Sequence, residues 1–220
     1  MTIPKSAAID DEGVWNQVLR LPPGNGNKPA LFLDRDGVVL EEVNYLRAAG
    51  DARLIPGAAE TIAAANRLAV PVVIITNQAG IARGYFDWEA FAAVQDKLLA
   101  DLAALGAFID GVFACPHHSM GNPPYNHPDH PARKPNPGML LRAATMLELD
   151  LSRSWIVGDR AGDLGAGRNA GLAGGLHVLT GHGGDDGERQ AAQALAGDGF
   201  IVLTADSIAK SQEELPVLQK

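Results

Sequence analysis

The stretch Ala30-Leu31-Phe32-Leu33-Asp34-Arg35-Asp36-Gly37-Val38 decides how this chain folds. Its four leading apolar residues are typical of a strand buried in a parallel sheet. Asp34 and Asp36 follow at the carboxyl end of that strand, where ligands bind in open α/β sheets. Residues two apart in an extended segment point to the same side, so these two like charges require a compensating cation or a reaction that uses them.

Strand and helix patterns alternate along the rest of the chain. Strand patterns cover about 70–75, 108–114, 154–157, 175–179 and 200–203, and helical patterns cover about 57–69, 88–105, 137–148, 162–170 and 188–196. This alternation predicts an α/β fold with a doubly wound parallel sheet. We expect a single domain over residues 29–210, with a loop insertion at about 115–133 and a tail at 211–220.

The N-terminal residues 1–28 do not continue this alternation. They hold Val14, Trp15, Val18 and Leu19, a short amphipathic pattern, followed by the breaker Pro22-Pro23-Gly24-Asn25-Gly26. Such a segment predicts a peripheral arm that carries no chemistry.

Composition limits the partners and compartments of the chain. Its 220 residues carry a formal net charge of −8, which argues against a nucleic-acid-binding surface. The single cysteine, Cys115, rules out an internal disulfide framework and fits a reducing compartment. No apolar run is long enough to cross a bilayer and no signal-peptide pattern is present, so we expect a cytoplasmic monomer without a membrane partner.

Polar residues gather where the predicted strands end. They are Asp34 and Asp36 after the first strand, Thr76 and Asn77 after the second, Arg133 and Lys134 before a helix that leads to the fourth, and Asp159 and Arg160 after the fourth. The carboxyl ends of parallel strands share one edge of a sheet, so these groups can converge. Crowded carboxylate oxygens fit Mg²⁺, which takes few protein ligands and adds phosphate oxygens. A lysine and a threonine beside them can hold a phosphoryl group.

These motifs resemble those of the haloacid dehalogenase (HAD) superfamily of phosphotransferases. Asp34-Arg35-Asp36-Gly37 looks like its DxD motif, and Thr76, Lys134 and Asp159 match its other three motifs in order. The runs at 77–84, 115–118 and 133–140 further resemble the D-glycero-D-manno-heptose 1,7-bisphosphate 7-phosphatases. The N-terminal phosphatase domain of bifunctional histidine-biosynthesis enzymes, which acts on histidinol phosphate, is a close relative. The resemblance covers roughly residues 30–205.

The resemblance implies a HAD-like fold and a Mg²⁺-dependent phosphomonoesterase. Its small-molecule substrate would be heptose 1,7-bisphosphate, which loses its C7 phosphate through an aspartyl-phosphate, in the biosynthesis of nucleotide-activated heptose for the lipopolysaccharide core. Asp34 would be the nucleophile and Asp36 the general acid and base. Asp34, the backbone carbonyl of Asp36, and Asp159 would hold Mg²⁺. Thr76 and Lys134 would stabilise the transferring phosphoryl group.

The resemblance also implies substrate contacts from Tyr45, Asn77, Arg133 and Arg160. Arg133 falls where the family reads the rest of the sugar phosphate. Arg160 stands where many relatives have lysine. Arginine keeps the positive charge, but its forked guanidinium donates hydrogen bonds with a different geometry from an ammonium group. The loops are too short for a cap domain, so loop insertions would form a minimal cap. Histidinol phosphate remains an alternative substrate, and a non-catalytic HAD-fold phosphate-binding protein remains an alternative function.

Many family members hold a structural zinc in the insertion through Cys-x-His and a later Cys-x-Cys. Cys115 and His117 match the first pair, whereas the second pair reads His130-Pro131-Ala132. Three candidate zinc ligands therefore remain, Cys115, His117 and His130, and a closed structural site normally has four. Either His127 or His118 supplies the fourth, or the loop has lost its metal and is stiffened by its prolines instead.

Overall fold

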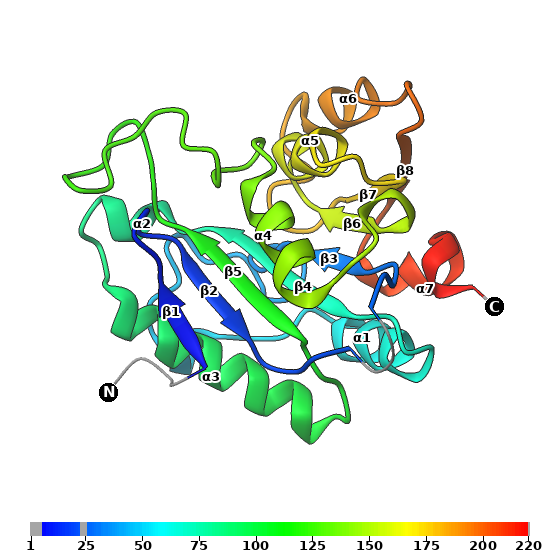
Figure 1. The fold of residues 1–220 in the computed structure, drawn as a ribbon, viewed down its shortest axis with the longest axis horizontal. Coiled ribbons are helices and arrows are strands. Elements are labelled where there is room, and N and C mark those ends of the chain that lie inside the picture. Colours follow the sequence, from blue (N-terminus) through cyan, green and yellow to red (C-terminus); the bar gives the residue numbers. More distant parts are fainter. Residues whose placement is uncertain (1–5, 23–25, 220) are drawn as a thin grey trace.

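The computed structural model describes residues 6–22 and 26–219, and one eight-stranded sheet lies at its centre (Figure 1). The strand order is β1-β2-β5-β4-β3-β6-β7-β8. The six strands from β5 to β8 in this order are parallel, whereas β2 is antiparallel to both β1 and β5. The strand bounds are β1 (Ala7–Ile9), β2 (Trp15–Val18), β3 (Leu31–Leu33), β4 (Val72–Asn77), β5 (Gly111–Cys115), β6 (Trp155–Gly158), β7 (Gly174–Val178) and β8 (Ile201–Ala205).

Helices connect the parallel strands, which confirms the predicted α/β fold with a doubly wound sheet. The longest of them, α3, begins at a side-chain cap, because Asp87 accepts the backbone N–H of Ala90 at 2.9 Å. Among the described residues, no helix has the length and apolar character that a bilayer crossing needs. The helix bounds are α1 (Ala58–Arg67), α2 (Ala79–Ala82), α3 (Trp88–Ala104), α4 (Gly138–Leu147), α5 (Ala161–Asn169), α6 (Glu188–Gln193) and α7 (Ser211–Glu214), with 3-10 turns at Ala49–Asp51, Leu151–Arg153, Ile208–Lys210 and Pro216–Leu218.

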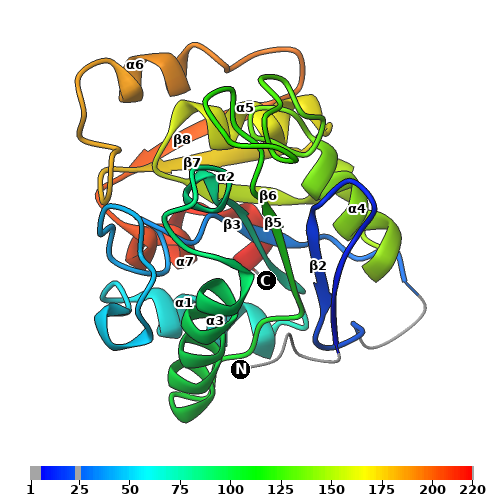
Figure 2. The same cartoon turned by 90° about the vertical axis from the view of Figure 1, so that its left-hand side faces the viewer.

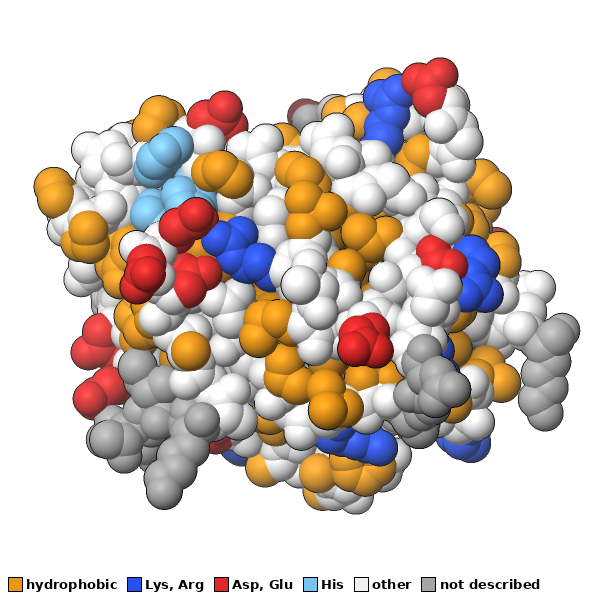
Figure 3. Space-filling model, in the orientation of Figure 1, with side chains coloured by type: hydrophobic (Ala, Val, Ile, Leu, Met, Phe, Trp, Pro, Cys, Tyr) orange, Lys and Arg blue, Asp and Glu red, His pale blue; other side chains and the backbone are white. Residues whose placement is uncertain are grey.

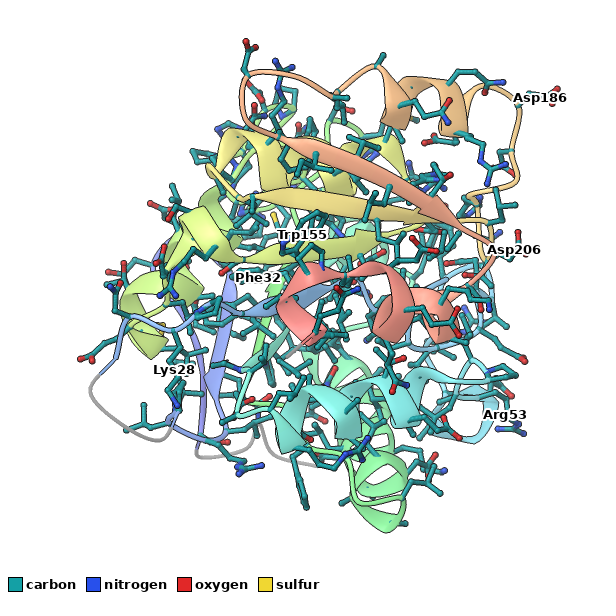
Figure 4. All side chains as sticks on the ribbon, turned by 90° about the vertical axis from the view of Figure 1, so that its right-hand side faces the viewer. Lys28, Phe32, Arg53, Trp155, Asp186 and Asp206 are labelled. Carbon is teal, nitrogen blue, oxygen red and sulfur yellow. The ribbon has the colours of Figure 1, made fainter. Side chains whose placement is uncertain are left out.

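Alternate residues of the central strands enter two separate cores, one on each face of the sheet (Figure 2). On β3, Leu31 and Leu33 pack with α1, α3 and the C-terminal segment, whereas Phe32 packs with α4, α5 and α6. Figure 4 shows Phe32 and Trp155 in the interior and Asp186 at the periphery. Burial on both faces explains why the parallel strands read as continuous apolar runs.

The N-terminal segment differs from the prediction, because it pairs with the sheet. Residues 7–18 form the β1–β2 hairpin, which pairs with β5 so that Trp15 lies opposite Ala114. The interpretation of residues 1–28 as a peripheral arm is therefore wrong for this hairpin, while residues 1–5 and the core of the predicted breaker, 23–25, lie outside the described residues. In the predicted tail, Leu215 and Leu218 are buried in the core beside α1.

The indole of Trp15 joins the hairpin to the main core. Its side chain is fully buried and its ring lies 5.5 Å from that of Trp88 and 5.2 Å from that of Phe91, centroid to centroid. We expect Trp15→Ala to lower the free energy of unfolding by about 3–5 kcal/mol, because it leaves a large cavity. Urea denaturation measures this loss. Leu21→Ala, at a side chain that is 73 % exposed, is the control and should have almost no effect; an equally small loss for Trp15→Ala would mean that the hairpin does not dock in solution.

Candidate active site

Three buried carboxylates meet at the carboxyl edge of the parallel sheet. Asp34 follows β3, Asp159 follows β6, and Asp163 lies in the first turn of α5. Each offers a carboxylate oxygen within 4.8 Å of the other two, and their exposed fractions are 8 %, 1 % and 3 %. Burial raises the pKa of Asp34 well above its usual range, and burial together with Asp163 raises the pKa of Asp159 to about 7. Such a cluster of hard oxygen ligands fits a divalent cation like Mg²⁺.

Lys134 is the buried cation of this cluster. Its Nζ lies 2.7 Å from Oδ1 of Asp34 and 2.8 Å from Oδ1 of Asp163, and it donates to the carbonyl of Ile75 at 3.0 Å. Burial alone would lower the pKa of Lys134, but these two carboxylates raise it above its usual range, so the side chain stays charged. One ammonium among three carboxylates leaves the cluster short of positive charge.

Asp163 has two partners in the structure. Its Oδ2 accepts the backbone N–H of Arg160 at 2.9 Å, which fixes the start of α5. Its other oxygen pairs with Lys134. Asp163 therefore links the loop after β6 to the lysine, a role that its sequence position alone did not reveal.

Asp36 has a different set of partners from Asp34. Arg35, only 1 % exposed, forms two parallel hydrogen bonds of 3.0 Å with the Asp36 carboxylate. The Gln78 amide donates to Oδ2 of Asp36 and lies within hydrogen-bond distance of Oγ1 of Thr76, both at 2.9 Å. Arg35 and Gln78 were not predicted as site residues, although each stands beside a motif residue. They hold Asp36 next to Thr76 and outside the carboxylate cluster.

Gly37 allows the loop after β3 to approach Asp159. Its φ is 85°, and a Cβ there would lie 2.3 Å from Oδ2 of Asp159, so a side chain at this position would collide with the carboxylate. The loop after β7 closes from the other side, because Thr180 donates to the carbonyl of Gly37 and the N–H of His182 donates to Asp159. The Asp159 carboxylate is thus fixed by backbone on two sides.

A cavity of about 490 Å³ opens above the cluster. Asn77 lines it, but both of its side-chain polar atoms bond the backbone of Lys134, at 3.1 and 3.2 Å, so Asn77 positions the lysine in this structure. Arg160 is half exposed at the rim, 3.9 Å from Glu188. The cavity brings together every residue predicted for catalysis, substrate and Mg²⁺, namely Asp34, Asp36, Tyr45, Thr76, Asn77, Arg133, Lys134, Asp159 and Arg160, and it adds Gln78, Arg83, His118, Asp163, His182 and Glu188 among others.

The insertion does not assemble a zinc site from Cys115, His117 and His130. In the described part of the chain, the one group of three metal-binding side chains within 4.8 Å of each other is the aspartate cluster. The rings of His117 and His130 stack in parallel, 3.8 Å apart at 1°. Their nitrogen lone pairs therefore lie in parallel planes and cannot both meet one ion at the Zn–N distance of about 2.0 Å. Cys115 is fully buried in the core, and burial raises the pKa of its thiol to about 11.

The N-terminal hairpin contacts the insertion near His117 and holds it in place. His117 Nε2 lies 2.6 Å from the carbonyl of Glu12, and Arg142 of α4 pairs with both Asp10 and Glu12. Figure 3 shows histidine, acidic and basic side chains side by side on this face. Hydrogen bonds and ion pairs from the hairpin thus occupy the place where the resemblance implied a metal.

Comparison with known proteins identifies the family. A family model described as HAD-hydrolase-like matches residues 131–202. A D-glycero-beta-D-manno-heptose-1,7-bisphosphate 7-phosphatase of Mesorhizobium japonicum is 49 % identical, over 77 % of this chain and 78 % of its own. The chain belongs to the HAD phosphatase family. Like its relatives, this HAD phosphatase is a phosphoric monoester hydrolase.

Two further relatives of this HAD phosphatase extend the comparison. A Vibrio cholerae protein with the same name as the Mesorhizobium relative is 39 % identical, over 70 % of this chain and 83 % of its own. The crystal structure of a D,D-heptose 1,7-bisphosphate phosphatase from B. bronchiseptica, in complex with magnesium and phosphate, superposes with a TM-score of 0.71 at 33 % identity. That match covers 85 % of this chain and 97 % of the other.

Proposed function

We propose that this HAD phosphatase hydrolyses the C7 phosphate of D-glycero-D-manno-heptose 1,7-bisphosphate. The observation that carries the proposal is the buried Asp34–Lys134 pair beside Asp159, at the base of a cavity that also holds Arg83 and Arg133. A carboxylate paired with a lysine suits attack on a phosphoryl group, and the arginines suit a substrate with further negative charge. The names of the relatives support the same substrate.

The proposed reaction has two steps. In the first, Asp34 attacks phosphorus through the oxygen that Lys134 does not hold, the bond between phosphorus and O7 breaks, and Asp36 donates a proton to the leaving alkoxide. In the second, Asp36 takes a proton from water, the water oxygen attacks the aspartyl-phosphate, and inorganic phosphate leaves. Thr76 and Lys134 hold the phosphoryl oxygens in both steps.

Magnesium fits the carboxylate cluster, and we propose that Asp34, Asp159 and the backbone carbonyl of Asp36 hold it. Both oxygens of Asp163 already have partners, Lys134 and the N–H of Arg160, so Asp163 supports the ligands and does not add one. When bound, the ion offsets the carboxylate charge and draws the phosphate oxygens into place.

Two arginines of the cavity favour heptose bisphosphate over histidinol phosphate, although Glu42 and Glu188 line the cavity as well. Arg83 and Arg133 both line it. Histidinol phosphate has one phosphate and an ammonium group, which these guanidinium groups would repel, whereas a second phosphate would be attracted. The presence of all four motif residues in one cavity also disfavours a non-catalytic role. We further propose a monomer that works in the cytoplasm, in nucleotide-activated heptose biosynthesis.

A substrate panel tests this function. We expect kcat/KM for heptose 1,7-bisphosphate to exceed that for histidinol phosphate by about 100-fold or more, because the wrong substrate leaves the half-buried guanidinium groups of Arg83 and Arg133 unpaired. The panel should contain both anomers, since the 49 % identical relative is named for the β anomer and a 39 % identical protein of Photorhabdus laumondii for the α anomer. Chelation of Mg²⁺ should stop hydrolysis of every substrate. A preference for histidinol phosphate would overturn the assignment.

A further inference from the structure

The segment that carries Arg133 into the cavity has no regular structure of its own. Residues 116–137, all of them described, contain the insertion and connect β5 to α4 without a helix or a strand. Arg133 lies near the end of this segment and lines the cavity that contains Asp34. A segment of this kind keeps its position through contacts with its surroundings. The position of Arg133 in the cavity therefore depends on what holds the insertion.

Two histidines of the insertion hold Arg133 at two points. Nη1 of Arg133 donates to the carbonyl of His117 at 2.9 Å, and its backbone N–H donates to the carbonyl of His130 at 2.8 Å. Both histidines are buried, and their rings stack in parallel, 3.8 Å apart. The side chain and the backbone of Arg133 thus rest on one packed pair of residues.

The tip of the β1–β2 hairpin supports this pair of histidines. The carbonyl of Glu12 lies 2.6 Å from Nε2 of His117, and because a carbonyl oxygen only accepts, Nε2 is the donor. The carboxylate of Glu12 lies 3.8 Å from Nε2 of His130. Arg142 of α4 pairs with the same carboxylate and with Asp10. The tip is therefore fixed to the body of the protein as well as to the insertion.

Gly13 allows the tip to approach the insertion closely. The turn is shaped by the Asp10 carboxylate, which accepts two of its backbone N–H groups at 3.0 and 2.9 Å. Gly13 has a φ of 75°, and a Cβ there would lie 2.7 Å from the ring of Tyr125 in the insertion. The Tyr125 hydroxyl accepts the indole N–H of Trp88 at 3.1 Å, which restrains the ring. A side chain at position 13 would thus force the hairpin and the insertion apart.

We propose that the tip of the β1–β2 hairpin, acting through Glu12 and His117, sets the position of Arg133 in the cavity and thereby the KM for the sugar substrate. The inference rests on the proposed function for the identity of that substrate. His117 is a positioning residue, because it lies between the hairpin and the insertion and reaches the substrate through Arg133. Such support matters, since a displacement of about 1 Å can lower a rate by about 100-fold.

A double-mutant cycle tests this coupling with heptose 1,7-bisphosphate and p-nitrophenyl phosphate. We expect His117→Leu to raise KM for the bisphosphate about tenfold, the usual effect of losing a well-placed charged hydrogen bond. The values for p-nitrophenyl phosphate, which has no sugar, should change less than about 3-fold. In the Arg133→Gln background, His117→Leu should raise KM no further. His117→Gln keeps a donor near Nε2 and should stay close to the wild type.

Gly13→Ala tests the contribution of the hairpin itself. The new methyl group would collide with Tyr125, so we expect KM for the bisphosphate to rise about 3- to 10-fold. Gly106→Ala is the matched control, because Gly106 has a φ of 74° and a Cβ there would meet nothing within 4 Å. Both exchanges strain the backbone alike, so Gly106→Ala should cost some stability and leave KM unchanged.

Three results would overturn the inference. Equal losses on both substrates, or losses that add in the double mutant, would reduce His117 to a residue of the fold. An unchanged KM in either His117→Leu or Gly13→Ala would separate the hairpin from substrate binding. If the substrate panel favours histidinol phosphate, the proposed function falls, while the same cycle run on histidinol phosphate still decides whether His117 acts through Arg133.

Discussion

Asp34→Asn is expected to abolish phosphatase activity, with kcat at least about 10⁴-fold below that of the wild type. The amide has nearly the shape of the carboxylate, so the fold and the hydrogen bond from Lys134, 2.7 Å in the wild type, should persist. An amide oxygen is a poor nucleophile, however, and no aspartyl-phosphate can form. Steady-state release of inorganic phosphate measures the loss. Activity within tenfold of the wild type would show that the mechanism does not pass through Asp34.

Asp36→Asn should impair the proton transfers and not the nucleophilic attack, so it is the matched control for Asp34→Asn. With p-nitrophenyl phosphate the leaving group needs no proton, so Asp36→Asn should still release up to one equivalent of p-nitrophenol in a burst and then turn over slowly. Asp34→Asn should show no burst. The distinct partners of the two carboxylates, Lys134 for one and Arg35 with Gln78 for the other, are the structural basis for this difference. Identical burst kinetics would contradict the separation of roles.

Lys134→Met should impair both catalysis and stability. It removes a cation that two buried carboxylates share, at 2.7 and 2.8 Å, and leaves Asp34 and Asp163 unpaired in the interior. Breaking a buried ion pair from one side costs about 3–5 kcal/mol of unfolding free energy. Losing one group that stabilises the phosphoryl transition state lowers kcat by about 10²–10³-fold. Urea denaturation and initial rates measure the two effects.

Lys97→Met provides the matched control for this substitution. Lys97 pairs with Asp101 one turn along α3, but its side chain is 42 % exposed. A surface pair of this kind contributes about 0.3–0.5 kcal/mol, so both stability and activity should stay close to the wild type. If Lys134→Met were as stable as Lys97→Met, the buried arrangement of Asp34, Lys134 and Asp163 would not exist in solution.

The parallel part of the sheet could be predicted because its signals are local. Each of its strands is an apolar run between turn residues, and the carboxyl ends of β3, β4 and β6 carry the polar groups that topology then brings together. The predicted helix at 88–105 corresponds to α3, Trp88–Ala104, because its cap, Asp87, is visible in the sequence. The convergence of Asp34 and Asp159 follows from these positions, whereas Lys134 lies just before α4 and its role was implied by the resemblance.

What the sequence did not reveal depends on partners far away in the chain. Asn16 and Gln17 are polar yet buried in β2, so the hairpin lacks the pattern of a strand with one exposed face. Its edge position and its pairing with β5 become visible only in three dimensions. The same holds for the ion pair of Asp163 with Lys134, and for the contact of 3.2 Å between Arg83 and His118. Cys115 matched a zinc motif by spacing, but among the described residues its thiol does not come together with His117 and His130 as a group of metal ligands.

The β1–β2 hairpin has a consequence for the order of events during synthesis. The ribosome makes the hairpin before the parallel strands, yet its neighbour in the sheet, β5, ends at Cys115 and emerges only after β3 and β4. Trp15 must therefore stay exposed on the nascent chain until α3 and β5 are available. The hairpin thus takes its place in the sheet only after the strand that it pairs with has been made.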